Sequence, residues 1–77
     1  MAPRKRKAAK QVLAENLLRL RGERGLSQRD LAAAARVRQP LISAIELQTA
    51  NPTLSTLESI AQALDVAVGE LLLPASD

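Results

Sequence analysis

Residues 28–47 read QRDLAAAARVRQPLISAIEL and contain two short helical patterns separated by a three-residue break. Ser27 lies three residues before Asp30, a variant of the capping box that predicts the start of the first helix. The Ala-rich run that follows favours a helix to about position 35, because alanine has the highest helix propensity. Pro40 fits only the first turn of a helix, so the second helix is predicted over about residues 39–47.

Small and apolar residues stand where two such helices, crossing at about 90–120°, would meet. Ala32 offers the small contact point, and apolar side chains lie on both sides of the turn at Leu31, Val37, Ile42 and Ile45. This arrangement is typical of a helix-turn-helix unit, in which the first turns of the second helix enter the major groove of DNA.

Helical periodicity continues on both sides of this unit. Apolar residues at positions 12, 13, 17 and 20 predict a helix over about residues 9–24, which Gly25 would end. A cap at Thr53 or Ser55 begins a helix to about Leu64, and residues 69–73 form a short fifth helix before Pro74. We therefore predict an all-α, compact five-helix domain over residues 9–74, with a basic flexible N-terminal arm at residues 1–8 and a tail at residues 75–77.

The composition excludes several classes of protein, because the chain has no His, no Cys and no aromatic residue. Zinc ligand sets, thiol nucleophiles and imidazole bases are missing, so no enzyme, metal or cofactor is expected. Stacking of single-stranded bases on aromatic side chains is disfavoured, whereas reading the grooves of a duplex needs no aromatic residue. No apolar run approaches the roughly 18 residues of a membrane span, and no signal peptide is readable, so we expect a cytoplasmic protein without a membrane partner.

Charge is divided unevenly along the 77 residues, although the net charge is only +3. All 11 Lys and Arg residues lie at or before Arg38, where only three acidic residues accompany them, so residues 1–38 carry +8. Residues 39–77 hold five acidic residues and no basic one, which gives −5. This distribution predicts a polyanionic partner bound by one end of the molecule.

The sequence resembles the lambda-repressor-like family, also called the Cro/CI or XRE type, over about residues 17–73. Small complete proteins of this kind include phage-type repressors and the controller proteins of restriction-modification systems. The resemblance is carried by residues at unbroken spacing, namely Leu26, Ser27, Gln28, Leu31, Ala32, Val37, Ile42, Ser43, Ile45, Glu46, Asn51, Pro52, Leu54, Leu57, Ala61, Ala63, Leu64, Val66 and Leu71.

The resemblance implies roles in DNA binding for individual residues. Gln39 opens the recognition helix, where its amide could bond an adenine and supply about 1–3 kcal/mol of discrimination. Ser43 and Ala44 follow one turn later, where a hydroxyl and a methyl group can touch base edges. Arg38 could reach a guanine or hold the backbone. Phosphate contacts are implied for Gln28, Arg29, Arg36, Gln48, Thr49 and Asn51.

Arg21 and Glu46 match a pair that in the family ties the first helix to the third. A partly buried, hydrogen-bonded pair of this kind fixes geometry more than it adds stability, whereas a plain surface pair would be worth little. The resemblance thus implies either a joint between two helices or an ordinary surface contact.

Several positions depart from the family pattern. Arg36 stands where the family usually has Gly, so the turn is either strained by about 1 kcal/mol or slightly rearranged. Arg38 replaces a Ser or Thr cap worth roughly 1 kcal/mol. Pro40 removes a base-reading side chain, and Gln48 replaces a loop Gly. The base preference of relatives therefore cannot be transferred to this chain.

The N-terminal arm contains four basic residues in succession, at Arg4, Lys5, Arg6 and Lys7. Such an arm can wrap into the minor groove, add sequence-independent affinity for phosphate, or serve solubility alone. Contact with DNA is the interpretation that the arm's charge favours.

Three consecutive leucines near the end of the chain, Leu71, Leu72 and Leu73, span more of a helix surface than one small domain can bury. At least one is expected to be exposed, and we predict that they form a dimer interface near the acidic end. The alternative is a frayed chain end with one exposed leucine.

These features predict a sequence-specific transcriptional regulator that binds double-stranded DNA as a homodimer. Its two recognition helices would lie about 34 Å apart on a pseudo-palindromic operator. We expect a repressor or controller protein with no small-molecule effector, because the helices account for the whole chain. An antitoxin-type regulator, which would bind a toxin through the C-terminal leucines, and a sequence-independent nucleic-acid binder are the alternatives.

Overall fold

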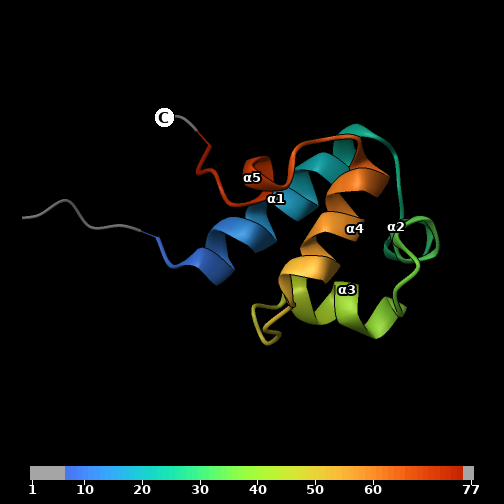
Figure 1. Ribbon diagram of the computed structural model, residues 1–77, viewed down its shortest axis with the longest axis horizontal. Helices are drawn as coiled ribbons and strands as arrows, with labels where there is room; N and C mark the ends of the chain where they lie inside the picture. The colour runs from blue at the N-terminus through green and yellow to red at the C-terminus, as the bar shows by residue number, and fades with distance from the viewer. Residues whose placement is uncertain (1–6, 76–77) are drawn as a thin grey trace, which may run out of the picture.

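The computed structural model describes residues 7–75, which form five helices and no strand (Figure 1). The helices are α1 (Ala9–Glu23), α2 (Gln28–Ala35), α3 (Gln39–Glu46), α4 (Leu54–Leu64) and α5 (Val68–Leu71). The predicted all-α fold is confirmed, and the first four helices agree with their predicted ranges within a residue at each end. No helix of residues 7–75 has the length and apolar character needed to cross a membrane.

Side-chain caps account for the starts of α2 and α4. Ser27 Oγ accepts the N–H of Asp30 at 2.9 Å, and Asp30 Oδ2 accepts the N–H of Ser27 at 3.0 Å, so the predicted capping box is present. The hydrogen bond from the Ser27 backbone lowers the pKa of the Asp30 carboxyl. Of the two predicted caps for α4, Thr53 is the one used, since its Oγ1 accepts the N–H of Thr56 at 3.1 Å.

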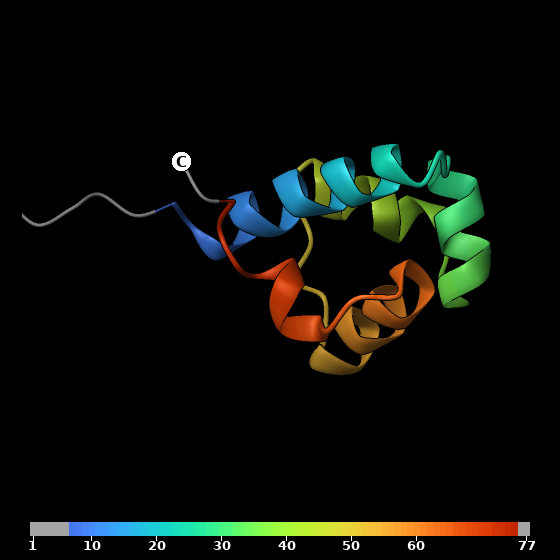
Figure 2. The same ribbon diagram turned by 90° about the horizontal axis from the view of Figure 1, so that it is seen from above.

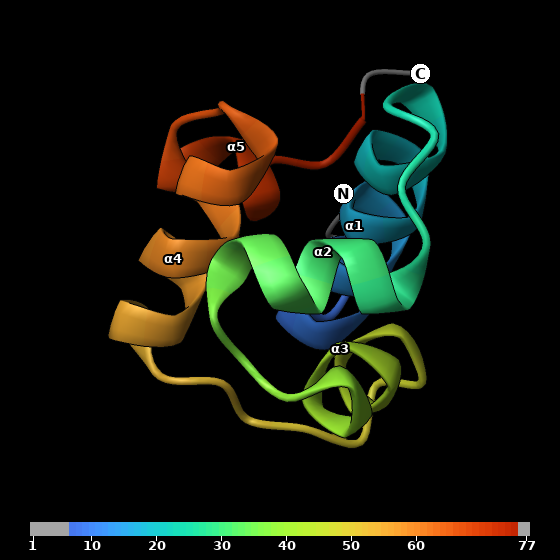
Figure 3. The same ribbon diagram turned by 90° about the vertical axis from the view of Figure 1, so that its right-hand side faces the viewer.

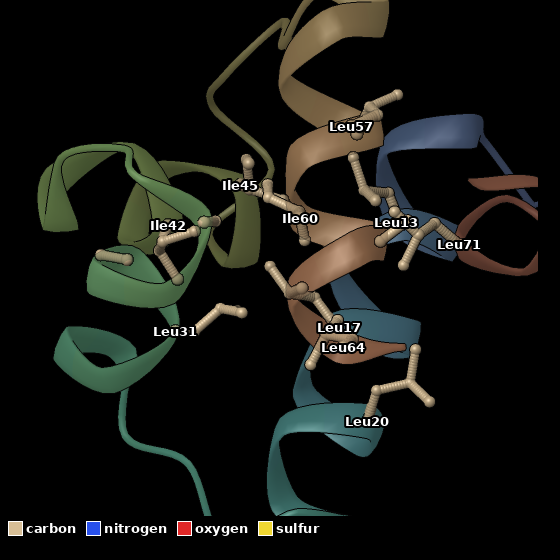
Figure 4. Packing of buried hydrophobic residues seen from close by; sticks show 13 residues of the cluster. Leu13, Leu17, Leu20, Leu31, Ile42, Ile45, Leu57, Ile60, Leu64 and Leu71 are labelled. Atoms are coloured by element: carbon tan, nitrogen blue, oxygen red, sulfur yellow. The ribbon is translucent and has the colours of Figure 1, made fainter. Parts of the chain in front are cut away.

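The core is a single apolar cluster to which all five helices contribute (Figure 4). α1 packs against α3 and α5, while α2 packs against α3 and α4. α2 closes one end of the molecule, and both ends of the described chain lie toward the other end (Figure 2). The most deeply buried apolar side chains are Leu17, Leu31, Ile42, Ile45, Ile60, Leu64 and Leu71.

α3 lies along one edge of the molecule, and α5 lies on the far side from it (Figures 1 and 3). α5 is shorter than predicted, because it ends at Leu71 rather than at position 73. Leu72 is its C-terminal cap residue, with φ of −109° and ψ of 6°, so the last predicted residues leave the helix. This difference decides where the three C-terminal leucines point.

Candidate nucleic-acid interface

The start of α3 presents a polar face to solvent because its apolar residues point inward. Ile42 and Ile45 are buried in the core, whereas Gln39 is exposed and Ser43, one turn later, is half-buried. Ala44 is also half-buried. The predicted base-reading residues of α3 therefore lie in its first two turns with surface to offer a ligand.

Backbone geometry at the start of α3 agrees with the predicted departures from the family pattern. Arg38 occupies the N-cap position, and no side-chain hydrogen bond caps the helix there. Pro40 lies in the first turn, where backbone N–H groups have no acceptor within the helix, so the N–H that proline lacks costs no hydrogen bond. Arg38 itself is exposed at the N-terminal end of α3.

Arg36 adopts the left-handed conformation, with φ of 58° and ψ of 41°. The N–H of Val37 bonds the carbonyl of Ala32 at 3.0 Å and closes α2. This is the helix end in which a left-handed Gly usually stands, so the turn has the same backbone conformation with Arg36 in that place. Of the two predicted possibilities, strain and rearrangement, the structure shows the strained turn. A side chain with a Cβ costs on the order of 1 kcal/mol there.

Arg21 and Glu46 form the predicted joint between α1 and α3. The Nε and Nη2 atoms of Arg21 lie 2.9 and 3.1 Å from the two carboxylate oxygens of Glu46, whose side chain is only 6% exposed. Arg21 also donates to the carbonyl of Leu26 at 2.9 Å. The hydrogen bonds to Glu46 raise the pKa of Arg21, and the pair fixes the C-terminal end of α3 on α1.

Gln28 joins the same network, which the sequence did not reveal. Its Nε2 donates to Glu46 Oε1 at 2.8 Å, so the first residue of α2 is tied to the last residue of α3. The side chain is half-buried and keeps a second amide hydrogen and a carbonyl oxygen. The predicted phosphate contact of Gln28 would therefore use an amide that is already anchored.

Three arginines surround this unit without an ion pair among residues 7–75. Arg29 lies in the first turn of α2, and Arg36 and Arg38 flank the turn before α3. All three are exposed, whereas the ion pairs of the described residues involve Lys7, Arg19, Arg21 and Arg24. Their charges are not neutralised within the domain and are available to an anion.

The loop after α3 carries the other predicted phosphate contacts. Gln48 adopts a left-handed φ of 64°, in agreement with its place at a loop Gly of the family. The Thr49 hydroxyl donates to the carbonyl of Ala44 at 3.2 Å, so its hydrogen is already engaged. Gln48, Thr49 and Asn51 are all exposed beside the C-terminal end of α3.

Most of the basic arm lies outside the described residues, which include only Lys7 of its four predicted DNA contacts. Lys7 is exposed, and its Nζ lies 2.9 Å from Glu15 Oε1. This hydrogen bond lowers the pKa of the Glu15 carboxyl. Arg4, Lys5 and Arg6 fall outside residues 7–75, so their DNA contact stays a prediction.

The prediction of a shared interface for the three C-terminal leucines was wrong for one of them. Leu71 has no exposed surface and packs in the core, because it is the last residue of α5 and faces α1 and α4 (Figure 4). Leu72 and Leu73 are 42% and 65% exposed. Other exposed leucines were missed. Leu18 and Leu47 lie outside the apolar stripes, which gave a signal, whereas Leu54 is at helical spacing from the buried Leu57 and gave none.

Comparison with known proteins agrees with this geometry. The helix-turn-helix family HTH_3 matches residues 17–71. The chain belongs to this family. It is 43% identical over 60 residues to the HTH-type transcriptional regulator DdrOP3 of Deinococcus deserti, a match that covers 78% of this chain and 46% of that protein. The chain thus corresponds to about half the length of that relative.

Two solved structures have a similar fold. The hypothetical transcription factor NHTF from Neisseria superposes with a TM-score of 0.85 at 35% identity, covering 96% of this chain and 88% of that one. The restriction-modification controller protein C.AhdI from Aeromonas hydrophila gives 0.80 at 29% identity, covering 84% and 98%. The family resemblance is confirmed, and this chain is a helix-turn-helix DNA-binding module of the kind found in transcriptional regulators, not an enzyme.

Proposed function

We propose that the protein is a sequence-specific regulator of transcription that binds double-stranded DNA in the cytoplasm as a homodimer. The observation that carries this proposal is the exposed start of α3, where Gln39 and Ser43 follow Arg36 and Arg38, two exposed arginines that form no ion pair among the described residues. An α-helix held outward by its buried face fits the major groove with such side chains at its N-terminal turns.

Affinity and specificity would come from different residues in this interface. α3 carries no basic residue, so its base contacts would be the amide of Gln39, the hydroxyl of Ser43 and the methyl group of Ala44. Arg29, Arg36, Gln28 and the loop at residues 48–51 would hold phosphates on either side. Phosphate contacts position the protein, and base contacts choose the sequence.

A second copy is required if the operator is pseudo-palindromic, because one domain presents a single α3. Leu72 and Leu73 are exposed and directly follow α5, which lies on the far side from α3 (Figure 1), so they supply apolar surface for self-association there.

The regulator would act as a repressor or as a controller protein of a restriction-modification system. The fold likeness to C.AhdI favours the controller role. No small-molecule effector is proposed, since the described residues are occupied by the helix-turn-helix unit and its supporting core. The antitoxin alternative gains no support from the relatives described above.

Selection of binding sites from a random DNA pool at physiological salt tests sequence-specific binding. We expect enrichment of a two-fold symmetric sequence with half-sites one helical turn apart, about 10 base pairs. A pool that remains random after several rounds would instead identify a sequence-independent binder. Methylation and ethylation interference on the selected site would then separate base contacts from phosphate contacts.

Sedimentation equilibrium tests the homodimer directly. Leu72→Glu and Leu73→Glu each place a carboxylate on the proposed surface and are expected to give monomers. Leu47→Glu, which changes an equally exposed leucine beside α3, serves as the control and is expected to remain dimeric. Two dimeric variants at positions 72 and 73 would refute this interface.

A further inference from the structure

Asn16 of α1 is the single buried polar residue among residues 7–75, with only 2% of its surface exposed. Its Nδ2 lies 2.8 Å from the carbonyl oxygen of Leu71, 2.9 Å from that of Leu73 and 3.2 Å from that of Glu70. Its Oδ1 accepts a hydrogen bond from Arg19 Nη2 at 3.3 Å. Every polar atom of the side chain therefore has a partner.

These bonds are the main attachment of the chain after α5. The last four carbonyl groups of a helix have no partner within the helix. Because α5 has only four residues, most of its carbonyl groups need a partner from elsewhere. The N–H of Leu72 bonds the carbonyl of Gly69 at 3.1 Å. Beyond Leu72, the only hydrogen bond of the described residues is the one from Asn16 to Leu73.

The tie fixes which leucines are buried and which are exposed. Leu71 fills the core, while Leu72 and Leu73 lie on the surface. Since the carbonyls of Leu71 and Leu73 are both bonded to one amide, rotation of the backbone between them would break a hydrogen bond that is buried at Leu71 and part-buried at Leu73. The position of the exposed leucines thus depends on a residue of α1 that is more than 50 positions away in the sequence.

We propose that Asn16 is a positioning residue for the association of two copies of this chain, through the surface formed by Leu72 and Leu73. The proposal rests on the homodimer proposed above. Charges of both signs lie next to this surface, because the exposed Arg19 bonds the Oδ1 of Asn16 and the exposed Glu70 accepts from Asn16 Nδ2 through its backbone carbonyl. A two-fold contact whose axis passes between Arg19 and Glu70 brings each charge toward the opposite charge of the second copy, which favours a second copy as the occupant.

Two variants at position 16 test this role. Asn16→Leu keeps the branched shape and the number of side-chain heavy atoms but removes the donor, and Asn16→Ala removes both the branch and the donor. Sedimentation equilibrium without DNA should show the dimer dissociation constant rising by at least about tenfold in each, because the leucine surface is no longer held in one shape. Asn16→Leu adds apolar burial and is the variant to use if Asn16→Ala does not fold.

The matched control is Ile42→Val, which weakens the core at α3 without touching the tie. Its dimer dissociation constant should stay within about twofold of the wild-type value. A similar rise in the control would show that any loss of core packing weakens the dimer and would overturn the proposal. So would an unchanged constant in the Asn16 variants.

Amide hydrogen exchange separates failure of this proposal from failure of the homodimer. In the Leu73→Glu background, where association is blocked, Asn16→Leu should make the Leu72 amide exchange at least about tenfold faster, while the Leu57 amide is unaffected. Unchanged exchange would overturn the positioning role even if the wild type is a dimer. A monomeric wild type would overturn the homodimer, and with it the role of Asn16 in association.

Discussion

α3 and α5 are each fastened to α1 by one polar side chain, but in different ways. Arg21 holds α3 through a charged network that also includes Gln28, whereas Asn16 holds the end of α5 through a neutral amide. α3 has eight residues and buries two isoleucines, so packing already places it and the network orients it. α5 has four residues, and its exit depends on the tie itself.

This difference favours separate roles for α3 and α5 in the proposed function. The Arg21, Glu46 and Gln28 network fixes the orientation of α3, which the proposed base reading would require. The α5 end positions a small apolar surface. The variants below test whether DNA binding and self-association depend on different residues, and whether α3 needs its fixed orientation or only nearby charge.

Loss of the carboxylate at the α3 joint is expected to have the largest effect. Glu46→Ala leaves Arg21, which is mostly buried, with one remaining acceptor, and should lower the free energy of unfolding by about 3 kcal/mol. Urea denaturation measures this loss. Glu23→Ala breaks only exposed pairs and should cost less than about 1 kcal/mol. Equal losses in the two variants would mean that the joint is no stronger than a surface pair.

Removal of the first side chain of α3 should affect DNA binding alone. Gln39→Ala is expected to reduce operator affinity by about 1–3 kcal/mol and to relax the preference at one base pair. Binding to a panel of single-substitution operators measures both effects. Gln62→Ala, on the exposed face of α4, is the control. An unchanged base preference would refute the role of Gln39. A changed dimer dissociation constant would show that α3 also affects self-association.

Removal of the strained side chain in the turn between α2 and α3 should raise stability and lower DNA affinity. Arg36→Gly removes a Cβ from a left-handed residue and should stabilise the fold by about 1 kcal/mol, while it lowers the slope of log K against log salt by about one. Gln48→Gly relieves the same kind of strain without removing a charge. Thermal melting should rise in both variants, and the salt slope should change only in the first. A change of slope in both would contradict phosphate contact by Arg36.

Deletion of residues 1–7 is expected to have the smallest effect on specificity. It removes four basic side chains, so the magnitude of the salt slope should fall by up to about four while the selected sequence stays the same. Titrations of operator DNA at several salt concentrations measure the slope. The same slope before and after deletion would show that the arm does not reach DNA.

Local signals predicted most of the fold and much of the site. The capping box at Ser27 and Asp30, and Pro40 in a first helical turn, each act within a few residues of chain. Glu46 could be paired with Arg21 because the family resemblance supplied the partner. Asn16 was missed, although it lies four residues from both Val12 and Leu20 on the buried stripe of α1. The position of Asn16 indicated that its side chain is buried, but not which distant carbonyl groups it would bond.

Local sequence signals are sufficient to predict the helices, the helix-turn-helix unit and the side chains that α3 exposes. Periodicity, caps and turn residues are read within one helix or one turn, so they are complete in the sequence. Three features depend on tertiary packing: Gln28 joins Glu46, Leu71 turns inward, and Asn16 holds the end of the described chain. Buried polar atoms must find partners wherever the fold provides them, and that choice depends on which distant segments packing brings together.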